Sequence, residues 1–219
     1  MKKGKDGFYN RYIKRILDVI CASAAMLVFC WLYAIVAILV RVFLGKPVIF
    51  KQERPGMIDP KTGKEKIFKL FKFRSMTDKR DENGNLLPDK ERLTKFGRIL
   101  RATSLDELPE AVNIFKGDMS VVGPRPWLVK YLDYYTDFER KRQFVRPGLT
   151  GLSQVSGRNG VSWKERFELD AKYVEEVSFP LDVKIIFMTI KKAFVHEGIE
   201  FTEGHQSIME YFAEQTSVK

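Results

Sequence analysis

Cysteine and histidine are scarce in this sequence of 219 residues. The two cysteines, Cys21 and Cys30, are too few for a disulfide framework, which argues against a secreted protein and favours a reducing compartment. The two histidines, His196 and His205, lie far from them, so no cysteine or histidine spacing typical of a zinc site occurs. The length has room for one well-buried domain with an N-terminal appendage, and not for two ordinary domains.

Acidic residues are in the minority. The sequence holds 28 aspartates and glutamates against 38 lysines and arginines, which gives a formal net charge of +10. Such a surplus favours anionic partners, among them nucleic acid, acidic lipid and phosphorylated substrates. The charge narrows the class of partner without choosing within it.

Charge, glycine and proline are all absent from residues 19–40. At roughly 1.5 Å per residue, a helix of this length reaches about 33 Å, enough to cross a hydrocarbon core of about 30 Å. The segment therefore predicts a membrane helix.

Basic residues crowd both ends of this segment, whereas a spanning helix normally carries its positive charge on one side. The flanks favour a re-entrant helix that enters and leaves by the cytoplasmic face over a single span. The absence of proline and glycine is the argument for the span, because a re-entrant helix has to break. The flanking cations are Lys2, Lys3, Lys5, Arg11, Lys14 and Arg15 before the segment, and Arg41, Lys46, Lys51 and Arg54 after it.

Shorter elements follow the apolar segment. Residues 48–50 and 67–73 are typical of β-strands, separated by turn-rich sequence, and predict a short hairpin. Apolar spacing predicts helices, the last of which is amphipathic and suited either to the membrane interface or to packing on the domain core. These helices are expected over residues 91–100, 105–115, 162–177 and 181–195.

Two adjacent carboxylates, Asp106 and Glu107, stand where the helix over residues 105–115 should begin. Ser104 and Glu107 fit a capping box, in which each satisfies a backbone donor of the other, and this motif alone favours that structural role. Pro109 complicates the cap, because proline inside a helix removes a hydrogen bond. In either case the carboxylates lie beside exposed backbone N–H groups, where an anion is favoured.

Basic residues also recur in turns built from proline and glycine. Arginine held in a rigid turn suits bidentate contact with phosphate. One such turn is a weak signal, but four in a small chain point to an anionic ligand. The turns are Lys116-Gly117-Asp118, Gly123-Pro124-Arg125-Pro126, Arg146-Pro147-Gly148 and Gly157-Arg158-Asn159.

Six motifs in this order resemble those of the monotopic phosphoglycosyl transferases, the bacterial sugar transferase family, in their small single-domain form. The resemblance runs from about Tyr12 to His205, nearly the whole chain. The motifs are KQERPG at 51–56, FKFRSM at 71–76, SLDELP at 104–109, KGDMS at 116–120, VGPRP at 122–126 and RPGLTG at 146–151.

The resemblance implies an enzyme that moves a phosphosugar from a UDP-sugar to polyprenyl (undecaprenyl) phosphate, releases UMP and initiates glycoconjugate assembly. Asp106 would be the nucleophile that carries the phosphosugar covalently, and Glu107 the ligand of Mg²⁺. The other residues implied in substrate binding are Arg101, Arg125 and Arg146, followed by Lys72, Arg74, Arg158 and Asp170.

The predicted fold is α/β, mostly helical with a small β-hairpin or sheet, an N-terminal re-entrant membrane helix and interfacial amphipathic helices. We expect it on the cytoplasmic face of the bacterial inner membrane, in contact with membrane lipid and not with nucleic acid. One departure from the family is that Cys30-Trp31 replaces the Ser-Pro pair at which relatives commonly break the membrane helix. The expected parts are residues 1–46 with the membrane helix, the catalytic domain over 47–205 and a C-terminal tail over 206–219.

A rival hypothesis from another class uses the same features. A membrane-anchored basic module without enzymatic activity could bind anionic lipid or nucleic acid, with Asp106 and Glu107 as a helix cap only. The two hypotheses differ in what they predict: nucleic-acid binding should fall steeply with salt across many sequences, whereas the transferase should release UMP from one UDP-sugar in the presence of Mg²⁺.

Overall fold

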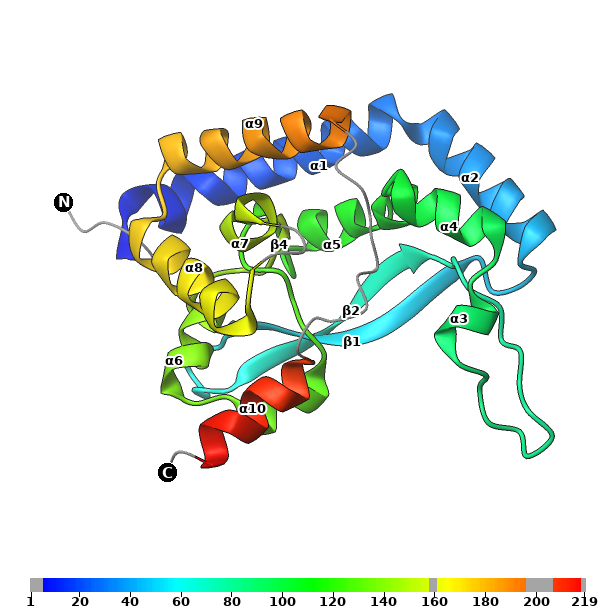
Figure 1. Ribbon diagram of the computed structural model, residues 1–219. Coiled ribbons are helices and arrows are strands. Elements are labelled where there is room, and N and C mark those ends of the chain that lie inside the picture. The colour runs from blue at the N-terminus through cyan, green and yellow to red at the C-terminus, as the bar shows by residue number, and fades with distance from the viewer. Residues whose placement is uncertain (1–5, 158–160, 196–206, 218–219) are drawn as a thin grey trace.

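The computed structural model describes residues 6–157, 161–195 and 207–217, and it is mostly helical with two small sheets (Figure 1). Strands β1 (Ile49–Ile58) and β2 (Glu65–Phe73) form the predicted antiparallel hairpin, with β1 longer than expected. Strands β3 (Ser120–Val122) and β4 (Gly148–Thr150) pair in parallel, which the sequence did not indicate. The abundance of helix and the small amount of sheet confirm the predicted class.

The predicted membrane helix is two helices. After a π-helical turn, η2 (Tyr9–Ile13), helices α1 (Lys14–Val28) and α2 (Cys30–Phe43) meet at a bend of 66°. The bend lies at Phe29, whose φ of −101° and ψ of 14° are not helical. No helix among the described residues is long and apolar enough to cross a membrane alone, whereas this bent pair meets the test of length and composition together.

Polar contacts fasten α1 to the rest of the chain. Arg15 donates hydrogen bonds to the carbonyls of Ile114 (2.6 Å) and Phe115 (2.7 Å). Three residues further on, the buried carboxylate of Asp18 accepts a hydrogen bond from the backbone N–H of Val121 at 2.9 Å. These contacts fix the direction of the first limb of the bent pair.

Helix α2 is fastened separately, which explains a bend without proline or glycine. The hydroxyl of Tyr33 donates to the carbonyl of Leu108. Val36 and Val40 are buried against Phe73 of β2 and against Leu100. Because both limbs are held by the domain in different directions, the helix has to break between them.

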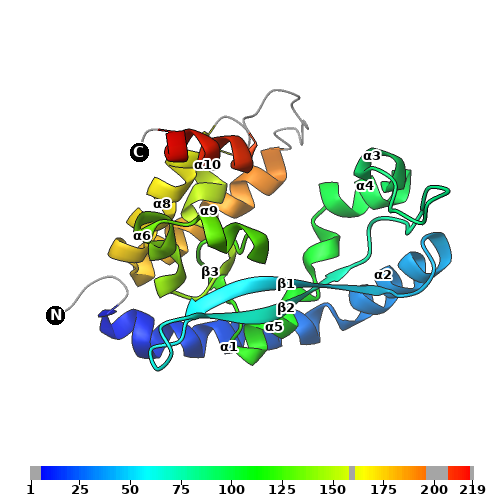
Figure 2. The same ribbon diagram turned by 90° about the horizontal axis from the view of Figure 1, so that it is seen from below.

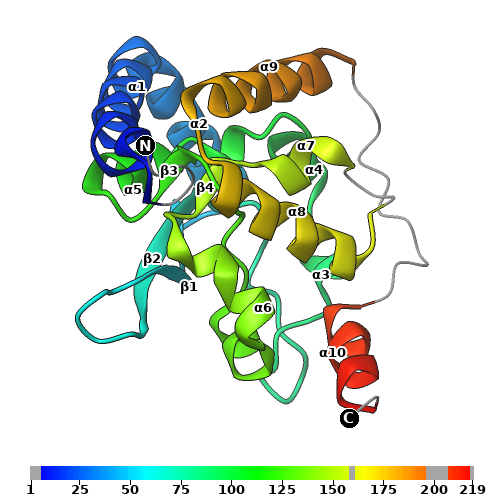
Figure 3. The same cartoon turned by 90° about the vertical axis from the view of Figure 1, so that its left-hand side faces the viewer.

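The outer faces of this pair are apolar and exposed. In Figure 1, α1 and α9 (Phe179–Val195) lie along the upper edge of the molecule and α2 slopes away from it. In Figure 3, α1 is seen nearly end-on and α9 runs obliquely away from it. Exposed apolar side chains on these helices include Ile16, Ile20, Leu27, Trp31, Ile38, Val42, Phe187 and Ile190.

The predicted helix over residues 105–115 is wrong in one respect, because the chain forms two elements there. A 3₁₀ turn, η3 (Leu105–Glu107), is followed by α5 (Glu110–Lys116), with Pro109 as the N-cap of α5. A proline at this boundary costs no hydrogen bond, since the first N–H groups of a helix have no intrahelical acceptor. The interruption places Asp106 and Glu107 outside regular helix.

The single helix predicted over residues 91–100 is wrong in one respect, because extended backbone at Leu93 and the N-cap at Thr94 divide it into two short helices. The helix predicted over residues 181–195 is found with an earlier start. The prediction over 162–177 is confirmed, including the cap at Ser162, whose side chain accepts from Glu165 N–H. The remaining helical elements are α3 (Asp89–Arg92), α4 (Lys95–Ala102), η4 (Val129–Tyr134), α6 (Asp137–Arg140), η5 (Lys141–Phe144), α7 (Leu152–Ser156) and α8 (Trp163–Glu176).

The C-terminal segment, which was predicted to be a tail, contains a helix. Within residues 206–219, α10 (Ile208–Ser217) forms, and Ile208, Tyr211 and Phe212 are buried in it. Figure 2 shows the hairpin crossing the molecule from α6, α8 and α10 at one end to α3 and α4 at the other. Asp106, Glu107 and Arg125 lie between these two groups of helices along the chain.

We predict that the break at Phe29 makes position 31 tolerant of proline. Trp31 lies in the first turn of α2, where backbone N–H groups have no acceptor within the helix. Trp31→Pro should therefore change the free energy of unfolding by less than about 1 kcal/mol, whereas Ala34→Pro, inside the same helix, should cost about 3 kcal/mol. Denaturation in detergent measures both variants, and equal losses would contradict a break at this position.

Candidate active site

Asp106 and Glu107 lie in a short turn with an unusual entry. Ser104 adopts the left-handed conformation with φ of 55°, which non-glycine residues rarely do and which commonly marks functional sites. Its side chain makes no capping hydrogen bond. The capping-box interpretation of Ser104 and Glu107 is therefore wrong, and the carboxylate of Glu107 is free to bind elsewhere.

Glu107 instead joins two basic side chains from distant parts of the chain. Lys72 Nζ, from the end of β2, lies 2.7 Å from Glu107 Oε1, and Arg125 Nη2 lies 2.8 Å from the same oxygen. Lys72 Nζ also lies 3.1 Å from Oε1 of the buried Glu110, in the first turn of α5. Glu107, Glu110, Lys72 and Arg125 thus form one network of ion pairs, and the charges of Lys72, Glu107 and Arg125 act on the adjacent Asp106.

Burial and charge divide these carboxylates into different states. Burial raises the pKa of Glu107, but Arg125 and Lys72 outweigh it and lower the value to about 2. For Glu110, burial and the negative charge of Glu107 raise the pKa to about 7. Burial also raises the pKa of Asp106, while Lys72 opposes this effect. Near neutral pH, Glu107 is a permanent anion and Glu110 is poised to hold a proton.

Arg101 lies near Asp106, whereas Arg74 binds groups outside the network around Glu107. Helix α4 approaches the end of β2 so closely that a Cβ on Gly97 would lie 1.8 Å from the carbonyl oxygen of Ser75. One turn later, Arg101 Nε donates to Ser75 Oγ at 3.0 Å, and its charge opposes the rise in the pKa of Asp106 that burial causes. Arg74 donates a hydrogen bond to the Met76 carbonyl at 2.8 Å and forms an ion pair with the exposed Asp78.

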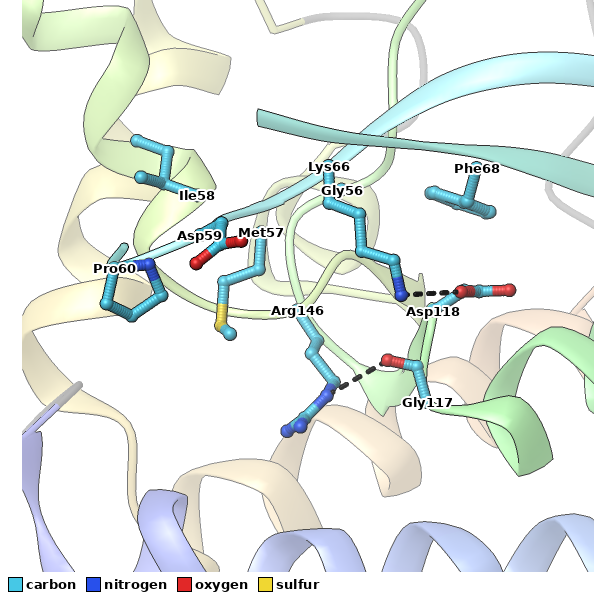
Figure 4. A pocket seen from close by; sticks show the side chains of 10 residues that line it. All are labelled: Gly56, Met57, Ile58, Asp59, Pro60, Lys66, Phe68, Gly117, Asp118 and Arg146. Atoms are coloured by element: carbon cyan, nitrogen blue, oxygen red, sulfur yellow. Dashed lines mark hydrogen bonds and ion pairs between the residues drawn. The ribbon is translucent and has the colours of Figure 1, made fainter. Parts of the chain in front are cut away.

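Arg146 lies in a different place. It lines a pocket of about 200 Å³ together with residues of the hairpin, and its Nε donates to the Gly117 carbonyl at 3.1 Å (Figure 4). In the same view Lys66 points toward Asp118, at 3.7 Å. None of the lining residues belongs to the network around Glu107. Arg146 is therefore not brought together with Asp106.

The last two predicted site residues are Asp170, which lies in a buried ion pair, and Arg158. Asp170 is buried on α8, where it accepts from Ser153 Oγ at 2.7 Å and pairs with Arg142 at 2.9 Å. Both charges of that pair are already matched, so Asp170 is not open to a ligand. Arg158 lies outside the described residues.

Two contributors were not among the predicted site residues. Glu110 follows Glu107 by three positions, and the expected single helix would have placed them on one face, which was an available signal. Arg54, in the first of the six motifs, donates to the Pro126 carbonyl at 3.0 Å and so holds the loop that carries Arg125. No local pattern indicates that second contact, because it joins residues far apart in sequence.

A magnesium ion fits this donor set only together with a substrate. Within the described residues, no three His, Cys, Asp or Glu side chains gather as a ready-made metal site. Lys72 and Arg125 both bind Oε1 of Glu107, however, which leaves Oε2 for another ligand. Mg²⁺ is commonly held by one or two carboxylates plus substrate phosphates and water, and Glu107 with Asp106 meets that requirement.

Comparisons with known proteins agree with the motifs. The sequence pattern of the bacterial sugar transferase family matches residues 9–196. The chain is 48% identical over 193 residues to an uncharacterised sugar transferase, EpsL, of Bacillus subtilis, covering 87% of this chain and 91% of that protein. It is 37% identical over 199 residues to a UDP-glucose:undecaprenyl-phosphate glucose-1-phosphate transferase of Klebsiella pneumoniae, covering 86% and 42%. It is 33% identical over 212 residues to an undecaprenyl-phosphate galactose phosphotransferase of Salmonella typhimurium, covering 86% and 42%. The chain thus spans about two fifths of those two longer relatives.

The raised pKa of Glu110 predicts a stability that depends on pH. The folded protein holds this proton up to about pH 7, whereas the unfolded chain loses it near the ordinary value of 4.5. Stability is therefore lost as the pH rises from 4.5 to 7, and Glu110→Gln should add roughly 2–3 kcal/mol at pH 8 and nothing at pH 4. Denaturation at both pH values measures this, with Glu168→Gln on the exposed side of α8 as the control. A gain of equal size at both pH values would contradict the prediction.

Proposed function

This chain belongs to the bacterial sugar transferase family, and from that premise we propose that it transfers a phosphosugar from a UDP-sugar to polyprenyl phosphate, such as undecaprenyl phosphate, releasing UMP. Two relatives are named for transfer of a sugar phosphate to undecaprenyl phosphate, one of them from UDP-glucose. The observation that carries the proposal is the network at Asp106 and Glu107, which occurs within the matched region and concentrates charge as phosphoryl transfer requires. The reaction would initiate assembly of a glycoconjugate.

Asp106 is the proposed nucleophile. A carboxylate oxygen attacks the β-phosphorus of the UDP-sugar, the bond from that phosphorus to the bridging oxygen breaks, and UMP leaves with the electron pair. The phosphosugar remains on Asp106 as an acyl phosphate. An oxygen of polyprenyl phosphate then attacks the same phosphorus, which frees the Asp106 carboxylate and forms the lipid-linked diphosphosugar.

The neighbours of Asp106 suit this role. Burial raises the pKa of Asp106, and Lys72, Arg101 and Arg125 oppose that rise and so favour the ionised form, which is the form that attacks. Glu107 would hold Mg²⁺, which supplies neutralisation of the diphosphate charge when it is bound. Arg125 and Lys72 are already ordered by Glu107, so little reorganisation is needed when a diphosphate arrives.

The acceptor requires a site at the membrane, and the bent helix pair suits it. We propose that α1 and α2 enter and leave the inner membrane by its cytoplasmic face, with the exposed apolar residues of α1, α2 and α9 against lipid. A lipid phosphate would then lie at the interface beside the domain. The basic residues on both flanks of the pair favour an anionic leaflet.

The rival hypothesis of a basic binding module is less well supported at Asp106 and Glu107. That hypothesis needs Asp106 and Glu107 as a helix cap, whereas Ser104 makes no capping bond and Glu107 binds Lys72 and Arg125. A network of buried, opposite charges is expensive to build for stability alone. Catalysis accounts for it better.

Asp106→Asn should abolish both turnover and the covalent intermediate. We expect UMP release to fall by about a thousandfold or more, the scale seen when a covalent nucleophile is removed. In the parent enzyme, labelled UDP-sugar without lipid should leave one phosphosugar on the protein, visible by intact mass, and the variant should show none. Asp133→Asn, an exposed carboxylate, is the matched control. Turnover within a few fold of the parent would remove Asp106 from this role.

The two ends of the bent pair should face the same compartment. A spanning helix would leave the N-terminal cations outside, against the usual charge bias. In a chain with Cys21 and Cys30 replaced by serine, Lys5→Cys should resist a membrane-impermeant thiol reagent in intact cells and react once the membrane is opened. Asp133→Cys, in the catalytic domain, should behave identically. Labelling of Lys5→Cys alone in intact cells would show a true span.

A further inference from the structure

Helix α10 lies beyond residues 9–196, the part of the chain matched by the family, yet it is firmly packed. Tyr211 is 6% exposed and Phe212 is 3% exposed. Tyr211 stacks on Phe167 of α8 with ring centroids 5.5 Å apart. The ring centroids of Phe212 and Tyr135 are 5.9 Å apart. We call Tyr135, Phe167, Tyr211 and Phe212 the C-terminal cluster.

A buried carboxylate secures this packing. Glu139 of α6 is 1% exposed and accepts hydrogen bonds at Oε1 from Tyr211 Oη (2.8 Å) and from Gln215 Nε2 (2.9 Å). Its other oxygen accepts from the backbone N–H of Thr136 at 2.9 Å. Truncating one partner of a buried charge is costly, so α10 is bound specifically and not only by apolar contact.

Arg142 lies beneath the C-terminal cluster and is 3% exposed. Its guanidinium is 5.5 Å from the ring centroid of Phe167 and 5.6 Å from that of Trp127, and Nη1 donates to Tyr135 Oη at 3.2 Å. Nη2 pairs with Asp170 at 2.9 Å and also donates to the carbonyl of Arg125. Arg142 therefore connects the cluster to the main chain of a proposed active-site residue.

Two arginines hold consecutive carbonyls of the same loop. Arg142 binds the carbonyl of Arg125, and Arg54 binds that of Pro126. The side chain of Arg125 extends from this loop to Glu107 at 2.8 Å. A shift of about 1 Å at a reacting centre can cost on the order of a hundredfold in rate, so a fixed backbone here has a catalytic consequence.

We propose that Arg142 is a positioning residue, which fixes the backbone of Arg125 so that its side chain meets Glu107, and that α10 keeps Arg142 in place by closing the C-terminal cluster over it. This inference rests on the proposed function for its kinetic effect, but its structural effect on the loop is independent of substrate. Arg142 itself contacts neither Asp106 nor Glu107.

The kinetic experiment compares three variants of the full-length chain. Arg142→Lys removes the forked contacts, Phe212→Ala loosens α10 from the cluster, and Met209→Ala alters an exposed side chain of the same helix as a control. With a UDP-sugar that the parent uses, we expect kcat to fall about tenfold to a hundredfold for the first two, with KM for the UDP-sugar changed less than about threefold. Met209→Ala should match the parent.

A double-mutant cycle separates positioning from general destabilisation. Each variant is repeated in an Arg125→Lys background, where the geometry that Arg142 preserves is already lost. If Arg142 and α10 act through Arg125, the second substitution should reduce kcat by less than about threefold further. Full multiplication of the two losses would overturn the inference.

Trp127 gives a readout that needs no turnover. With Trp31 and Trp163 replaced by phenylalanine it becomes the sole tryptophan, two residues from Arg125. Phe212→Ala and Arg142→Lys should increase quenching of its fluorescence by acrylamide, and Met209→Ala should not. Unchanged quenching in both variants overturns the inference, whether or not the parent is active. A parent that is inactive on every UDP-sugar would count against the proposed function instead.

Discussion

The contact of Glu107 with Lys72 and Arg125 is the interaction on which the site depends. It joins the end of β2, the turn before α5 and the loop after β3, three segments that no local structure would bring together. Because burial disfavours every charge in this group, each ion is stable only while its partners stay in place. The attraction between the carboxylates and the two cations offsets the cost of burying their charges. Lys72 and Arg125 are therefore ordered without a ligand.

Several constraints serve to keep those partners in place. Gly97 allows α4 to approach the chain after β2, which sets Arg101 beside Ser75. Ser104 takes the left-handed conformation, and Pro109 then starts α5, so that Asp106 and Glu107 are presented on a short turn instead of a continuous helix. The strain at Ser104 is tolerated because the surrounding contacts determine the backbone there.

Local patterns in the sequence predicted the elements well and their contacts poorly. The hairpin, α8 with its Ser162 cap and α9 follow from apolar spacing and turn residues, which act over a few positions. The predicted capping box at Ser104 was wrong. Ser104 and Glu107 fit this local motif, but the ion pairs of Glu107 with the distant Lys72 and Arg125 determine where its side chain binds. Arg125 and Arg146 both stand in proline-glycine turns, but Arg125 reaches Glu107 whereas Arg146 lies in the pocket beside Gly117, a separation that the local pattern does not reveal. The Asp170 carboxylate is matched by Arg142, a partner that no spacing rule identifies.

Helix α5 links the bent helix pair to the proposed active site. Its first turn carries Glu110, which shares Lys72 with Glu107, and its last carbonyls are held by Arg15 of α1. The Leu108 carbonyl, just before α5, accepts from Tyr33 of α2. The two limbs of the bent pair therefore hold the segment from Leu108 to Phe115 at its two ends, and this segment directly follows Asp106 and Glu107. If the pair lies in the membrane as proposed, its depth sets the height of Asp106 above the lipid directly, because α5 is too short and too firmly held to absorb a difference between them.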